Sequence, residues 1–178
     1  MGGKPWEELM ATLKNTLNII LGKQSLKESV KVTVINYAST ARMVFKKRDP
    51  DLELLSLITF SGGGTEFEAP LTLGYNTIIE TKNEFDLFTM AFLTDGGAPY
   101  PTTIINKINA DVEKVQSRMR FHGIQFGSET SNLKKMATDL NGNYSNVINV
   151  EELKNTFKEI INIGFKRSEE HTSELQSL

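Results

Sequence analysis

The chain has 178 residues, enough for one domain with its own hydrophobic core. Its 20 basic and 22 acidic side chains give a formal charge of −2, so no basic field exists to attract nucleic acid. It contains no cysteine, which excludes disulfides, thiol catalysis and thiolate metal sites. No apolar stretch reaches the ~20 residues of a membrane span, and we see no apolar signal core. These features lean weakly towards an intracellular protein.

The first half of the chain begins with an amphipathic pattern and continues with β-branched residues. Apolar side chains recur at helical spacing behind Pro5, and the helix pattern ends at Gly22. Residues 52–60 are apolar but ambiguous in their secondary structure. The other predicted elements are a strand over 30–37, a hairpin strand over 41–45, a surface loop over 46–51 and a helix over 66–80.

The second half is organised around the segment Phe88–Gly97, an apolar run that ends on an acid and two glycines. Such a run is typical of a strand that is buried on both faces of a parallel sheet. The further predicted elements are a helix over 102–119, a strand over 121–127, a helix over 130–140, a strand over 144–148, and a helix from a capping box at Asn149–Glu152 to about Ile163. This alternation predicts one α/β domain with a doubly wound, mostly parallel sheet and helices on both faces.

Two polar segments come directly after apolar elements and are the candidate functional residues. One is the loop Ser61, Gly62, Gly63, Gly64 and Thr65, and the other is Asp95 with Gly96. Ligands bind beyond the carboxyl ends of strands in open α/β sheets, so we expect both segments at the same edge. A hydroxyl and a carboxylate, without thiolate or imidazole, form a hard oxygen set that suits Mg²⁺, Mn²⁺ or Ca²⁺. Two protein oxygens are too few to hold such an ion.

Over residues 1–165 the chain resembles the von Willebrand factor type A (VWA) family, which has a Rossmann-like fold. The metal-ion-dependent adhesion site (MIDAS) of that family uses Asp-x-Ser-x-Ser after the first strand, a Thr before a central helix, and an Asp, usually as Thr-Asp-Gly, after the fourth strand. Thr65 matches the second element and Asp95 matches the third. The turn around Asn141-Gly142 before the last strand also fits the family.

The resemblance is incomplete at the start of the chain, because no Asp-x-Ser-x-Ser is present. Residues 1–6, Met-Gly-Gly-Lys-Pro-Trp, match the continuation of the chain directly after that motif in many members. We therefore expect a partial VWA domain over 1–165 that lacks the first, central strand. At the other end, Arg167–Leu178 resembles the in-frame translation of a common sequencing adapter, so we expect residues 166–178 to be an artefactual, disordered tail.

The resemblance implies a protein-interaction module and not an enzyme. Thr65 and Asp95 would contact a Mg²⁺ ion, or Mn²⁺ or Ca²⁺ in its place, while Ser61, Gly62–Gly64 and Gly96 shape the loops. A protein partner would present a carboxylate to the ion. One alternative is a structural VWA domain with a non-functional metal site. Another is a Mg²⁺-dependent phosphoryl-transfer enzyme, although Leu93 replaces the earlier acid of an Asp-x-Asp pattern and no phosphate-loop lysine comes after residue 64.

Overall fold

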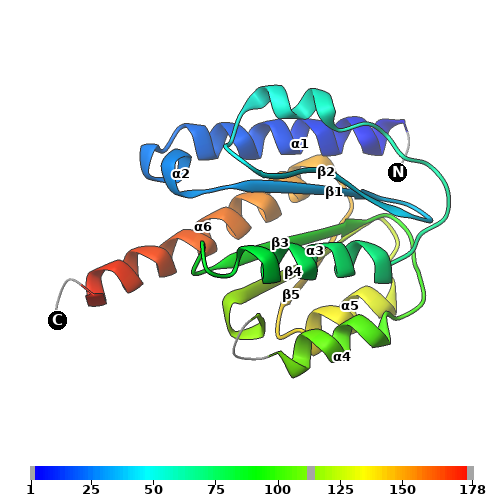
Figure 1. The fold of residues 1–178 in the computed structure, drawn as a ribbon. Coiled ribbons are helices and arrows are strands. Elements are labelled where there is room, and N and C mark those ends of the chain that lie inside the picture. Colours follow the sequence, from blue (N-terminus) through cyan, green and yellow to red (C-terminus); the bar gives the residue numbers. More distant parts are fainter. Residues whose placement is uncertain (1–2, 112–114, 176–178) are drawn as a thin grey trace.

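A computed structural model of the chain describes the backbone of residues 3–111 and 115–175 (Figure 1). The helices are α1 (Lys4–Leu21), α2 (Gln24–Ser29), α3 (Glu68–Thr81), α4 (Thr102–Ala110), α5 (Ser131–Asp139) and α6 (Val150–Leu175), with the short 3₁₀ helices η1 (Leu52–Leu57) and η2 (Gln116–Arg118). The strands are β1 (Val32–Tyr37), β2 (Ala41–Arg48), β3 (Phe88–Thr94), β4 (Met119–Phe126) and β5 (Asn143–Val147). None of the described helices is long and apolar enough to cross a membrane.

The strands form two separate sheets. β1 and β2 are an antiparallel hairpin, whereas β3, β4 and β5 form a parallel sheet with β4 in the middle. The parallel register places Phe92 opposite Gly123, and Gly123 opposite Tyr144. The expected α/β class with a parallel sheet is confirmed. The single expected sheet is interrupted between β1 and β3.

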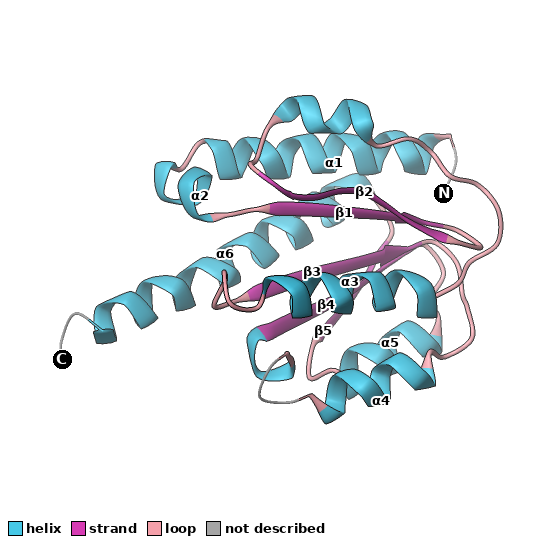
Figure 2. Cartoon of the chain, viewed as in Figure 1, coloured by secondary structure: helices cyan, strands magenta, loops and turns pink. Residues whose placement is uncertain are grey.

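Helices cover both faces of the strands (Figure 2). On one face, side chains from α3, α4 and α5 pack with Phe92 of β3 and Phe121 of β4 into the larger hydrophobic core. On the other face, α6 packs on Ile124 of β4 and Val147 of β5, and Leu13 of α1 joins this second core. Helices thus cover both faces of the parallel sheet, and its middle strand β4 is buried at six of its eight residues.

Two predictions about element length were wrong. The helix predicted over 102–119 ends at Ala110, and Met119 instead opens β4, where it pairs with Phe88 and is 2% exposed. Pairing in the sheet outweighs the helical spacing of the apolar residues here. The loop predicted over 46–51 begins too early, because β2 continues to Arg48, which pairs with Val32. The short helix α2 was not predicted.

The last helix starts as predicted and extends further than predicted. Oδ1 of Asn149 accepts a hydrogen bond from the backbone N–H of Glu152 at 3.0 Å, and Oε2 of Glu152 accepts one from the N–H of Ile148 at 2.9 Å. The side-chain cap by Asn149 is confirmed, while Glu152 bonds one residue earlier than in the standard capping box. The backbone of residues 166–175 is helical and continues α6. The expectation of an artefactual, disordered tail over 166–178 stays a prediction, as does the boundary at residue 165, and residues 176–178 lie outside the described residues.

Candidate metal-ion site

The glycine loop before α3 lies at the carboxyl edge of the strands, close to the turn of the β1–β2 hairpin. Gly63 has a φ of 129°, and a Cβ there would lie 2.9 Å from Oγ of Ser39. The backbone conformation requires glycine at residue 63, and the loop approaches Ser39 closely there. Ser61, Gly62 and Gly64 are exposed, and Thr65 is half-buried at the end of the loop.

The turn after β3 is built on the side chain of Thr94. This side chain is 3% exposed, and its Oγ1 accepts a hydrogen bond from the backbone N–H of Gly96 at 3.1 Å. The bond folds the chain sharply at Asp95, in the manner of a serine/threonine turn. Asp95 is exposed at this edge of the sheet, so its carboxylate is accessible to a ligand.

The two candidate loops meet at Thr65 and Gly96. A Cβ added to Gly96 would lie 2.6 Å from Oγ1 of Thr65 and 3.5 Å from its Cβ. The backbone next to Asp95 therefore touches the hydroxyl-bearing side chain of Thr65. The expectation that both segments lie at one edge agrees with this contact, while their role as metal ligands stays a prediction.

Tyr37, the last residue of β1, also reaches this edge. Its hydroxyl donates a hydrogen bond to the backbone carbonyl of Leu93 at 2.7 Å, and its ring lies 5.1 Å from that of Phe92 between centroids. Burial raises the pKa of Tyr37 well above its usual range, and the negative charge of Asp95 adds to this rise. The phenol is therefore a neutral hydrogen-bond donor close to a carboxylate.

The chemistry of the described residues fits a hard cation only in part. Thr65 and Asp95 offer a hydroxyl and a carboxylate, which are oxygen ligands that Mg²⁺ and Ca²⁺ accept. Within the residues that the structure describes, no group of three His, Cys, Asp or Glu side chains could hold a metal ion. A complete coordination sphere therefore needs oxygens from water, from a partner or from another polypeptide segment.

One residue that shapes the candidate loops and one further polar pair at the carboxyl edge were not predicted from the sequence. Ser39 lies against Gly63 from the hairpin turn. Near the end of β4, Oγ1 of Thr130, the residue before α5, donates to Oε1 of Gln125 at 2.7 Å, and Nε2 of the fully buried Gln125 has no partner among the described residues. Ser39, Gln125 and Thr130 lie at or near strand ends, and this position could have indicated that they belong to the carboxyl edge. Their contacts depend on how the strands pack, so the sequence does not predict them.

The fold is of the VWA type, as solved structures show. Proximal thread matrix protein 1 from the mussel byssus superposes with a TM-score of 0.63 at 15% identity, covering 87% of this chain. A VWA protein from Catenulispora acidiphila gives a TM-score of 0.58 at 15% identity over 86% of this chain. The chain spans 42% and 37% of the lengths of these two proteins. By contrast it spans 88% of BatB from Bacteroides thetaiotaomicron, with a TM-score of 0.63 and 15% identity.

A further structure of the mussel protein has a zinc-occupied MIDAS motif and matches with a TM-score of 0.64 and 18% identity over 88% of this chain. No family model matches the chain, and no curated protein matches it significantly. The structural likeness therefore establishes the architecture alone.

Proposed function

We propose that this chain is a divalent-cation-dependent protein-interaction module of the VWA type. Thr65 and Asp95 supply two oxygen ligands to a Mg²⁺ ion, or to Mn²⁺ or Ca²⁺ in its place. Ser61, Gly62–Gly64 and Gly96 form the loops that hold these two ligands together. The partner is a protein that presents a carboxylate, which completes the coordination with water and with oxygens that the described residues do not provide.

The observation that carries this proposal is the contact between the Thr65 and Gly96 loops. It brings a hydroxyl and a carboxylate from two distant segments to one edge, where ligands bind in open α/β sheets. The zinc-occupied MIDAS of the structurally similar mussel protein supports a metal at this edge. No described arrangement of nucleophile and base favours catalysis there.

Calorimetric titration with Mg²⁺ and with Mn²⁺ tests the cation site. We expect saturable binding that Asp95→Asn and Thr65→Ala each weaken at least tenfold. Asp86→Asn is a matched control, because Asp86 is an exposed acid near the opposite end of β3. Thr103→Ala, at an exposed position of α4, is the control for Thr65→Ala. If the chain binds no cation, or binds it equally well in all four variants, it is a structural domain without a metal site at this edge.

Selection of displayed peptides in buffer with Mg²⁺ tests the carboxylate. Peptides that bind should contain Asp or Glu, should lose binding when these are changed to Asn or Gln, and should be released by a chelator. Enrichment of peptides without an acid, or binding that survives the chelator, would contradict the proposed mode of recognition.

A further inference from the structure

The two outer strands of the fold, β2 and β5, differ in how their free edges are protected. Figure 1 shows them on the outside of the strand arrangement, with β1, β3 and β4 between them. Among the described residues β2 is hydrogen-bonded only to β1, and β5 only to β4, so each has one unpaired outer edge. Natural proteins protect such edges with charged side chains, prolines and bulges, because unpaired N–H and C=O groups are a template for another strand.

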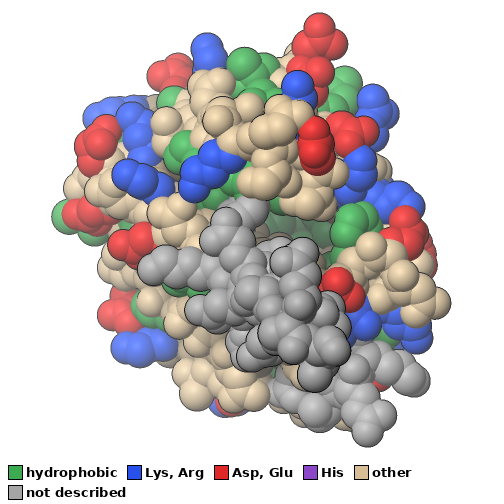
Figure 3. All heavy atoms as spheres, turned by 90° about the vertical axis from the view of Figure 1, so that its left-hand side faces the viewer, with side chains coloured by type: hydrophobic (Ala, Val, Ile, Leu, Met, Phe, Trp, Pro, Cys, Tyr) green, Lys and Arg blue, Asp and Glu red, His purple; other side chains and the backbone are tan. Residues whose placement is uncertain are grey.

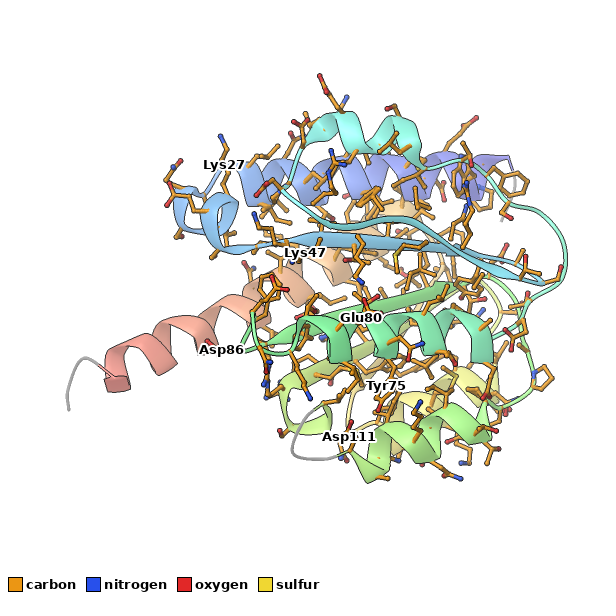
Figure 4. The ribbon with its side chains drawn as sticks, in the orientation of Figure 1. Lys27, Lys47, Tyr75, Glu80, Asp86 and Asp111 are labelled. Atoms are coloured by element: carbon orange, nitrogen blue, oxygen red, sulfur yellow. The ribbon has the colours of Figure 1, made fainter. Side chains whose placement is uncertain are left out.

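The strand β2 is protected by charge and by irregular pairing. Four of its eight residues are basic, and its register with β1 shifts twice. Lys46 forms an ion pair with Glu80 of α3, and Nζ of Lys47 lies 2.6 Å from Oε2 of Glu84. Figure 4 labels Lys47 and Glu80 on the hairpin and on α3, and Figure 3 shows charged side chains of both signs at the end of the molecule where β1 and β3 begin. A further strand is therefore disfavoured beside β2.

The strand β5 has none of these protections. Residues 141–150, which include all of β5, contain no charged side chain and no proline, although 24% of the residues in the chain are charged. The register between β4 and β5 is continuous. Asn143 and Asn146 are exposed, and Ile148, directly after the strand, is 68% exposed. An uncharged, regular edge of this kind favours pairing with another strand.

The hydrogen bonding beside β4 shows which backbone groups of β5 are directed outward. The carbonyl of Val147 accepts a hydrogen bond from the N–H of Gly127, the residue after β4, at 2.8 Å. The backbone polar groups of Val147 are therefore directed towards β4. Successive residues of a strand direct these groups to opposite edges, so Tyr144 and Asn146 direct theirs to the free edge. This edge thus presents two N–H donors and two C=O acceptors in regular alternation.

We propose that β5 pairs in the antiparallel direction with β5 of a second copy of the chain, around a twofold axis at Ser145. Tyr144 of each copy then lies opposite Asn146 of the other, and these two pairs exchange four main-chain hydrogen bonds. The two three-stranded parallel sheets become one sheet of six strands. The pairing requires no metal ion and does not rest on the cation site.

The free edge of β5 suits a second copy because it is complementary to itself. A twofold axis places the edge against its own sequence, so a charged edge would repel itself, whereas residues 141–150 carry no charge. Ser145 meets its copy in a pair without main-chain hydrogen bonds, where the Cα atoms approach to about 4.5 Å. Its small side chain permits this approach, and the two hydroxyls can hydrogen-bond to each other. Ile148 lies opposite Gly142 of the second copy, which leaves room for its exposed side chain to reach the adjacent Tyr144 ring.

Sedimentation equilibrium of the full chain tests this pairing. Two five-residue strands make a small interface, so we expect a weak dimer that is populated at about 100 μM of chain. Ser145→Lys places like charges opposite each other at the axis and should weaken the dimer at least tenfold, and Ser145→Glu should do the same. An equimolar mixture of these two variants brings opposite charges together and should restore a dimer, which also shows that both variants fold. Ser128→Lys, at an exposed position after β4, is the matched control and should dimerise as the unchanged chain does.

Cross-linking through a cysteine at the axis tests the register. The chain contains no cysteine, so Ser145→Cys introduces a single thiol per chain. A Cα separation of about 4.5 Å lies within the range of about 4.4–6.8 Å that disulfides span. With oxidised glutathione as the oxidant, Ser145→Cys should form a covalent dimer at least tenfold faster than the control Ser128→Cys. A chain that stays a monomer would overturn the proposal and assign this edge to a different polypeptide. A dimer that Ser145→Lys leaves unchanged, or equal cross-linking by both cysteine variants, would overturn it as well.

Discussion

Replacing Gly96 by alanine tests whether the loops at the candidate site touch as described. The new Cβ would lie 2.6 Å from Oγ1 of Thr65, whereas ordinary contact begins at 3.4 Å. Threonine is branched at Cβ and has few rotamers by which to move away. Overpacking costs about 1–3 kcal/mol in well-packed sites. Because Thr65 is only half-buried, we expect the free energy of unfolding of Gly96→Ala to fall by about 1–2 kcal/mol.

Urea unfolding followed by circular dichroism measures this loss. With an m-value of about 2 kcal/mol/M, the midpoint should fall by roughly 0.5–1 M. Thr65→Ala removes Oγ1 and leaves a Cβ at an ordinary contact distance, so the double variant should recover most of the loss. Gly97→Ala is the control, since its Cβ would lie 3.3 Å from Cγ2 of Thr130 and should cost less. The contact would be refuted if Gly96→Ala had the same urea midpoint as the unchanged chain. It would also be refuted if Gly96→Ala lowered the midpoint equally in the unchanged chain and in Thr65→Ala.

Three further predictions concern stability away from this contact. Burial, helped by the charge of Arg120, lowers the pKa of His122 below 6.5, so the unfolded chain binds the proton first as the pH falls. Stability should therefore be complete above pH 6.5 and decline below it, and His122→Gln should flatten this decline in melting temperatures measured against pH. Gly142→Ala would place a Cβ 2.3 Å from the carbonyl oxygen of Phe121, a backbone atom that cannot rotate away, and should cost about 3 kcal/mol in urea unfolding. Asn149→Ala removes the cap of α6 and should cost about 1 kcal/mol by the same measurement, with an unchanged m-value.

The parts of the fold that were predicted correctly depend on local signals. The side-chain cap at Asn149, the turn at Asn141-Gly142 and the apolar run of β3 each determine their own conformation within a few residues. The prediction of a helix over 102–119 was wrong because the end of this segment pairs with a strand that is distant in the sequence. Met119 pairs with Phe88 in the parallel sheet. Periodicity along the chain carries no information about such a pairing.

In the candidate site, too, some features could be predicted from the sequence and others could not. Strand ends at a common edge predict that Thr65 and Asp95 lie near each other, because this proximity results from the topology of a parallel sheet. The approach of Tyr37 could not be predicted from its sequence position, since it depends on how far the hairpin stands from β3. Its hydroxyl spans that distance to the carbonyl of Leu93.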